Sequence, residues 1–171
     1  APTKDAYDVT MWGENLAQAY ECMGAGYGED QIKFSFDTWA KASNVQYSYH
    51  ILFPNSSLFG CYGLRHKKYC ILNRQYSKDE YESLLPKIIQ HMNDMPYVDA
   101  KGRTYAYGEF FPPSLSPFGY NETLAQEYFA LTKKQALEKG FRWKDEVQRK
   151  HSITIMSDQL PDDISQVAET I

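Results

Sequence analysis

The sequence has little of what builds disulfide frameworks, membrane spans or nucleic-acid coats. It holds three cysteines among 171 residues, which excludes a disulfide framework. No apolar run approaches the ~18 residues that a membrane-spanning helix needs, and no signal-peptide pattern is visible. A net charge of −4 argues against wholesale coating of nucleic acid. These absences predict a cytoplasmic protein with no membrane partner.

Aromatic side chains are abundant, and they recur in a pattern. They make up 15% of the chain, including 14 tyrosines and 9 phenylalanines. An aromatic residue, a spacer and a small or apolar residue recur along residues 5–73, and the leading aromatics are spaced by 13, 14, 13, 12 and 10 residues. The copies are Tyr7-Asp8-Val9, Tyr20-Glu21-Cys22, Phe34-Ser35-Phe36, Tyr47-Ser48-Tyr49, Phe59-Gly60-Cys61 and Tyr69-Cys70-Ile71.

Turn-forming residues separate these copies, so each copy is predicted to be a short strand whose first and third residues point inward. Two copies in each turn give a coil of about 25 residues, within the range of known solenoids. The fold class we predict is a mainly β repeat, a β-solenoid-like stack of short strands with a C-terminal α/β cap. The alternative is an α+β fold in which the same strands form an antiparallel meander.

The period becomes helical after Tyr76. Ser77 and Glu80 fit a capping box, and apolar residues at helical spacing continue from Tyr81 to Met92. Pro86 predicts a kink in this helix. A second capping box, Thr132-Lys133-Lys134-Gln135, opens a helix that Gly140 is expected to end.

Three regions follow from these patterns. Residues 1–75 form the solenoid-like repeat, residues 76–156 an α/β cap with a Pro- and aromatic-rich loop, and residues 157–171 a linker or a truncated helix. Within the cap, residues 152–156 alternate in polarity and predict a strand. The opening residues do not read as a natural start, so we expect a fragment of a longer protein.

The motif Gly63-Leu64-Arg65-His66-Lys67-Lys68-Tyr69-Cys70 and its surroundings resemble uncharacterised proteins of uncultured candidate-phyla bacteria. Those proteins are cysteine-rich repeat arrays with zinc-ribbon-like flanks, and this chain resembles an internal fragment of them. The resemblance covers almost the whole chain, through residues 7–15, 19–22, 59–81, 107–113, 116–123 and 160–162. It implies a repeat fold and zinc-ribbon neighbours, but no activity. The repeats of this chain depart from that pattern by holding fewer cysteines, with alanine at positions such as 25, 40 and 42.

Two sets of residues are candidate sites. A metal such as zinc has four candidate ligands, although their spacing matches no known zinc pattern: Cys22, Cys61, His66 and Cys70. The alternative is that the cysteines are small inward residues and that no cofactor is bound. A basic cluster interleaved with tyrosine has the chemistry of a phosphate or nucleic-acid patch: Tyr62, Arg65, Lys67, Lys68, Arg74 and Lys78. The alternative for these cations is a solvated face, or contact with the acidic first coil of another copy.

The sequence holds no catalytic constellation, so we expect a non-enzymatic binding or scaffold module of a larger modular protein. Its expected partners are proteins or other modules of the same chain. One alternative is a nucleic-acid-binding module that uses the basic cluster. Another is a cysteine-dependent hydrolase or transferase, with Cys61 or Cys70 activated by His50 or His66.

Overall fold

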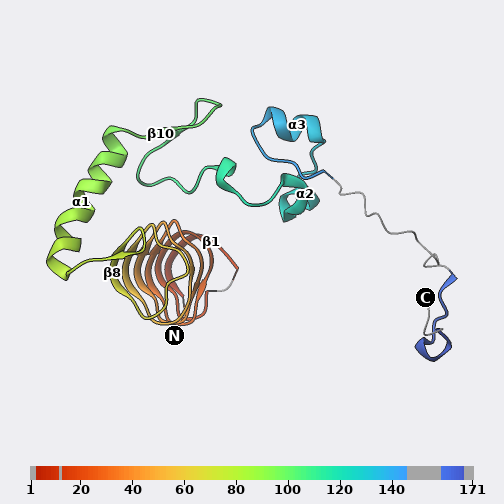
Figure 1. The fold of residues 1–171 in the computed structure, drawn as a ribbon, viewed down its shortest axis with the longest axis horizontal. Helices are drawn as coiled ribbons and strands as arrows, with labels where there is room; N and C mark the ends of the chain where they lie inside the picture. Colours follow the sequence, from red (N-terminus) through yellow and green to blue (C-terminus); the bar gives the residue numbers. More distant parts are fainter. Residues whose placement is uncertain (1–2, 12, 146–158, 168–171) are drawn as a thin grey trace.

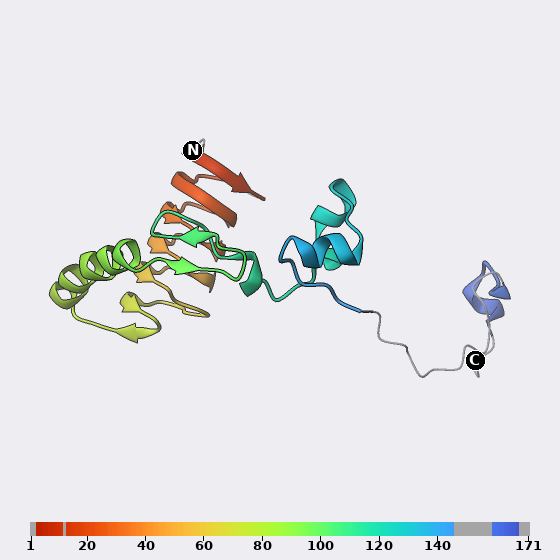
Figure 2. The ribbon, with the colours of Figure 1, turned by 90° about the horizontal axis from the view of Figure 1, so that it is seen from above.

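The structure, a computed structural model, describes residues 3–11, 13–145 and 159–167, and its dominant feature is a stack of short parallel strands. Figure 1 looks along this stack, and Figure 2 shows its coils from the side. The strands are β1 (Lys4–Thr10), β2 (Ala17–Gly26), β3 (Asp30–Lys33), β4 (Phe36–Trp39), β5 (Ser43–Gln46), β6 (Tyr49–Ile51), β7 (Ser56–Phe59), β8 (Lys68–Ile71) and β9 (Arg74–Gln75). The predicted β-solenoid is confirmed. The antiparallel meander is wrong, because all pairs from β1 to β8 are parallel.

Each coil is half as long as the pattern suggested. Ile32 pairs with Val45, and Val45 pairs with Leu58, so the register advances by 13 residues per coil. The last coil is one residue shorter, since Leu58 pairs with Cys70. The expectation of two aromatic copies per coil is therefore wrong, because each coil contains one copy.

Left-handed backbone at every third residue makes such short coils feasible. In the second coil, Gln18, Glu21, Gly24 and Tyr27 all have positive φ, and the same positions recur in the following coils. Most of these residues are not glycine, and each left-handed conformation costs about 1 kcal/mol or more. The cost is offset because each coil is hydrogen-bonded to its neighbours.

This backbone also corrects the predicted orientation of the aromatics. A left-handed residue at every third position replaces the two-residue alternation of a regular strand, so that only one residue in three points inward. Phe34 and Phe36, expected to be inward, both point away from the solenoid core on either side of the inward Ser35, and Phe34 is buried there because it packs on Tyr107. Tyr7 and Tyr20 are exposed.

Four columns of inward residues form the core. Apolar residues dominate it: Leu16, Ala19, Ala25, Ile32, Ala42, Val45, Ile51 and Leu58. One column holds small polar side chains that complete the hydrogen-bond ladder at a corner. There the Ser35 hydroxyl accepts the Ser48 amide at 3.2 Å, and the Ser48 hydroxyl accepts the Cys61 amide at 3.1 Å.

Helix α1 (Lys78–Asp94) covers one outer side of the stack. The predicted capping box is present: the Ser77 hydroxyl accepts the Glu80 amide, and the Glu80 carboxylate accepts the Ser77 amide at 2.9 Å. The predicted apolar face, led by the buried Tyr81, packs on Phe59 and Ile71.

The segment after α1 continues along the same side of the solenoid (Figure 2). It forms the antiparallel hairpin of β10 (Tyr97–Val98) and β11 (Thr104–Tyr105) and then runs on through residues 105–113. The Tyr107 hydroxyl donates to Gln46 at 2.7 Å, and the Gly108 amide donates to the Tyr47 hydroxyl at 2.9 Å. Burial raises the pKa of Tyr47 to about 12, as expected for a phenol enclosed between the two segments.

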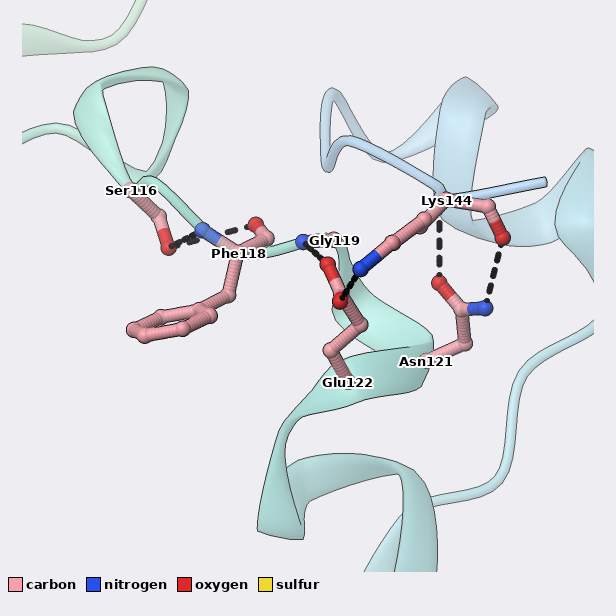
Figure 3. A network of polar contacts seen from close by, with 6 residues as sticks. All are labelled: Ser116, Phe118, Gly119, Asn121, Glu122 and Lys144. Atoms are coloured by element: carbon pink, nitrogen blue, oxygen red, sulfur yellow. Dashed lines mark hydrogen bonds and ion pairs between the residues drawn. The ribbon is translucent and has the colours of Figure 1, made fainter. Parts of the chain in front are cut away.

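The short helices form a separate lobe: η1 (Pro113–Leu115), η2 (Tyr120–Glu122), α2 (Leu124–Tyr128) and α3 (Lys133–Glu138). Figure 3 shows the contacts that hold Lys144 against η2 of this lobe. The Lys144 ammonium lies 2.5 Å from the Glu122 carboxylate, and the backbone of Lys144 exchanges two hydrogen bonds with the Asn121 side chain. The second capping box is also confirmed, at Thr132.

The last described element is a single helical turn, η4 (Ile164–Gln166). The strand predicted at residues 152–156 lies outside the described residues. No helix in the described part of the chain is long and apolar enough to cross a bilayer.

Candidate binding surfaces

The cysteines are core residues of the solenoid, and the structure does not bring them together with His66. Cys22 and Cys61 belong to the polar inner column, and their thiols donate to backbone carbonyls at 3.2 to 3.5 Å. Cys70 lies in the neighbouring column beside Leu58. His66 lies on the outer surface, stacked on Phe53. Within residues 3–11, 13–145 and 159–167, no three side chains are grouped to hold a metal ion.

Burial also disfavours nucleophilic chemistry at these thiols. It raises the pKa of Cys22, Cys61 and Cys70 above the ordinary value, so each stays protonated at neutral pH. A reactive cysteine needs the opposite, a lowered pKa and exposure to its substrate. The structure therefore offers no support for cysteine-dependent catalysis.

A thiol-reactive probe checks this directly. We expect no reaction of Cys22, Cys61 or Cys70 in the folded protein and full reaction after denaturation, because each is at most 3% exposed. The measurement is a time course with a chromogenic disulfide reagent. Rapid labelling of the native protein at Cys61 or Cys70 would contradict it.

The basic cluster lies on and beside the last coil, and most of its members have partners within the chain. The guanidinium of Arg65 lies over the Phe53 ring, and that of Arg74 lies over the Tyr76 ring. Lys78 forms an ion pair with Glu82 on α1. The other two cations of the cluster, Lys67 and Lys68, are exposed and form neither an ion pair nor a cation–π contact within the described residues.

Tyr62 belongs to a surface that the sequence did not reveal. Four outward side chains lie in register on successive coils and form what we call the aromatic column: Met23, Phe36, Tyr49 and Tyr62. The ring centroids of Phe36 and Tyr49 are 4.8 Å apart, and those of Tyr49 and Tyr62 are 5.3 Å apart. Tyr62, at the end of the column, is its most exposed member, at 60% against 36% for Tyr49.

Polar groups flank the aromatic column on the adjacent corner. Nδ1 of His50 lies 2.5 Å from the Asp37 carboxylate, and the His50 ring stacks on Tyr62. The indole of Trp39 donates to the same carboxylate. An apolar strip with a fixed polar edge of this kind is typical of a surface that contacts another macromolecule.

The aromatic column has a sequence signal, a spacing of 13 residues between its members, which is recognisable only once the coil length is known. Comparison of the chain with protein-family models, curated proteins and solved structures found no match. The function must therefore be inferred from the surfaces alone.

Proposed function

We propose that the protein is a non-enzymatic binding or scaffold module of a larger modular protein, and that the aromatic column is its contact surface. The observation that carries the proposal is the exposure of two rings on successive coils, Tyr49 and Tyr62, with the half-buried Phe36 in register beside them. An equivalent row of outward rings, which includes Phe34, Tyr47 and Phe59, is covered by residues of α1 and by Tyr107 and Phe111. No segment in the described part of the chain covers Tyr62 in this way.

The energetics favour a partner for this surface. Aromatic side chains bury large areas at little entropic cost, and they dominate the binding energy of interfaces. The rings pack against one another, so a partner meets mainly their edges and the flanking His50. This geometry suits a protein surface better than a flat ligand that must slide between rings.

The experiment is capture from native extract with immobilised protein. Wild type is compared with the double variant Tyr49→Ser and Tyr62→Ser, and with the control Tyr97→Ser, which removes a tyrosine of similar exposure from the β10–β11 hairpin. We expect a partner that the wild type and the control retain and the double variant loses. Equal capture by all three, or chemical conversion of the captured molecule, would overturn the proposal.

A second candidate function is nucleic-acid binding at the last coil. It is favoured by Lys67 and Lys68, which are exposed and form no ion pair within the described residues. A gel shift at about 50 mM salt, where phosphate binding is strong, should then be lost in the double variant Lys67→Ala and Lys68→Ala and kept in the control Lys87→Ala on α1. No shift of the wild-type protein under these conditions would exclude this function.

A further inference from the structure

A groove of about 510 Å³ lies between the first two coils and the segment of residues 105–113. Its walls are largely apolar, with Met23 on the solenoid side and Phe110 and Phe111 on the other. Three carboxylates also line it: Asp8, Glu21 and Glu109. A groove of this volume accommodates one or two long side chains.

The groove has an excess of negative charge with no cation to balance it. None of the residues that line it is basic, and the ion pairs among the described residues involve none of its three carboxylates. Asp8 and Glu21 lie side by side on paired strands, where like charges repel. The pKa of Tyr20 is raised by Glu21 foremost, and also by Asp8 and Glu109, so the fields of the three carboxylates overlap at one place.

The complementary charge lies at the other end of the stack. Lys67 occupies an inward position of the last coil, where its amide donates to Asn55 at 2.9 Å, yet its side chain is exposed because no coil follows. Lys68 is the first residue of β8 and is also exposed. No acidic residue occurs between positions 61 and 78, so both ammonium groups face solvent in a basic surrounding.

The last coil does not extend the stack by further parallel pairing. Strand β9 pairs with β8 in antiparallel fashion, and the side chain of Asn73 bonds both the amide and the carbonyl of Tyr62. A charged side chain at the inward position also opposes the docking of another coil. The two lysines are therefore available for a lateral contact but do not support end-on stacking.

We propose that the acidic groove of one copy binds Lys67 and Lys68 of a second copy, so that the protein assembles head to tail. The lysine stems lie along the apolar walls while their ammonium groups reach the carboxylates. The two contacting surfaces differ, so the interface is heterologous and generates open chains or rings. The inference rests on the proposed function, since self-assembly is what a scaffold module requires, but the four charged residues that carry it, Glu21, Glu109, Lys67 and Lys68, lie outside the aromatic column.

The test measures molar mass by light scattering over a range of protein concentrations, at low and at high salt. One variant reverses the groove, with Glu21→Lys and Glu109→Lys. Another reverses the basic end, with Lys67→Glu and Lys68→Glu. A control reverses two exposed lysines elsewhere, with Lys87→Glu and Lys139→Glu. Circular dichroism verifies that all variants are folded, and nuclease treatment removes any bound nucleic acid.

The expected mass of the wild type and the control rises with concentration and falls with salt, because the contact is screened. Each reversed variant is expected to be monomeric alone, and an equimolar mixture of the two is expected to associate, since the intact groove of one variant binds the intact basic end of the other. The proposal is overturned by a monomeric wild type at low salt, by assembly of either reversed variant alone, or by a mixture that does not associate. Assembly that disappears after nuclease treatment also overturns it and points to bridging by nucleic acid. None of these outcomes alters the capture experiment, so the two proposals fail separately.

Discussion

Replacing Glu29 with glutamine is expected to make the protein markedly more stable in alkaline buffer. Glu29 is 1% exposed inside the solenoid; one carboxylate oxygen accepts the Gly26 amide at 2.7 Å and the Thr38 hydroxyl at 3.1 Å, and the other oxygen has no partner. Burial raises its pKa from 4.5 to about 7. The charged form is therefore unfavourable in the folded protein.

The direction in which stability changes with pH follows from proton linkage. The folded state binds the Glu29 proton more tightly than the unfolded state, so stability is complete below about pH 4.5 and is lost as the pH rises through about 7. One pKa unit corresponds to about 1.4 kcal/mol, so the loss amounts to roughly 3 kcal/mol. Glutamine resembles the protonated acid and does not titrate, so Glu29→Gln avoids this loss.

Urea unfolding of the wild type and Glu29→Gln at several pH values measures the effect. The difference in unfolding free energy should grow with pH in favour of the variant and level off above pH 8. Glu14→Gln is the control, because it removes one charge at an exposed position of the preceding coil. A variant that is less stable than wild type by the same amount at every pH would refute the burial of a costly charge.

Excising a full coil is expected to do less damage than excising half of one. Deletion of residues 42–54 removes one 13-residue repeat and leaves Asn55 to continue after Lys41, so that Ile32 meets Leu58 in the place of Val45. The coils above and below remain in register. The main loss is that of the bonds from Gln46 and Tyr47 to residues 107 and 108, which lowers stability but preserves the stack.

The shorter deletion of residues 42–48 shifts every following residue to the wrong side of the coil. Arg65 would take the inward place of Leu58, and Tyr62 that of Asn55. An unpaired charge in an apolar core costs several kcal/mol, a large share of the ~5–15 kcal/mol that stabilises a typical domain. Hydrogen exchange of β1 to β8 and thermal unfolding distinguish the two variants. If the shorter deletion were the better tolerated, the 13-residue coil would be wrong.

Local signals in the sequence were sufficient for the start of α1 but not for the length of the solenoid coil. The capping box at Ser77 involves residues three positions apart, and the structure shows it as predicted. Coil length, in contrast, depends on which residues pair across coils. The spacing of 13 between Cys22, Ser35, Ser48 and Cys61 was present in the sequence, but these residues were not grouped together.

The predicted orientation of the strand side chains was wrong for a specific physical reason. A two-residue alternation is the rule for strands, and it placed both aromatics of Phe34-Ser35-Phe36 in the core. The regular occurrence of left-handed residues such as Gln31, Phe34 and Asp37 is not predictable from side chains that rarely adopt that conformation. The aromatic column depends on this geometry, which is why the sequence did not reveal it.

Of the candidate surfaces, the sequence points to the basic cluster and not to the aromatic column. The basic cluster was identified by its composition, but sequence alone does not show which cations are already paired. Arg65 is placed over Phe53, twelve positions before it, because the two residues occupy neighbouring coils. The same stacking explains why Cys61 and His66, close in sequence, lie on opposite sides of the coil wall.

The most direct test of the proposed contact surface is hydrogen exchange of the protein alone and bound to the partner that it captures. The account predicts new protection in β4, β6 and residues 60–63, which carry Phe36, Tyr49 and Tyr62, and little change in α1. It also predicts that Tyr49→Ser with Tyr62→Ser weakens binding at least tenfold, about 1.4 kcal/mol or more. Protection confined to α1 or to the lobe of residues 113–145, with unchanged affinity of the double variant, would contradict it.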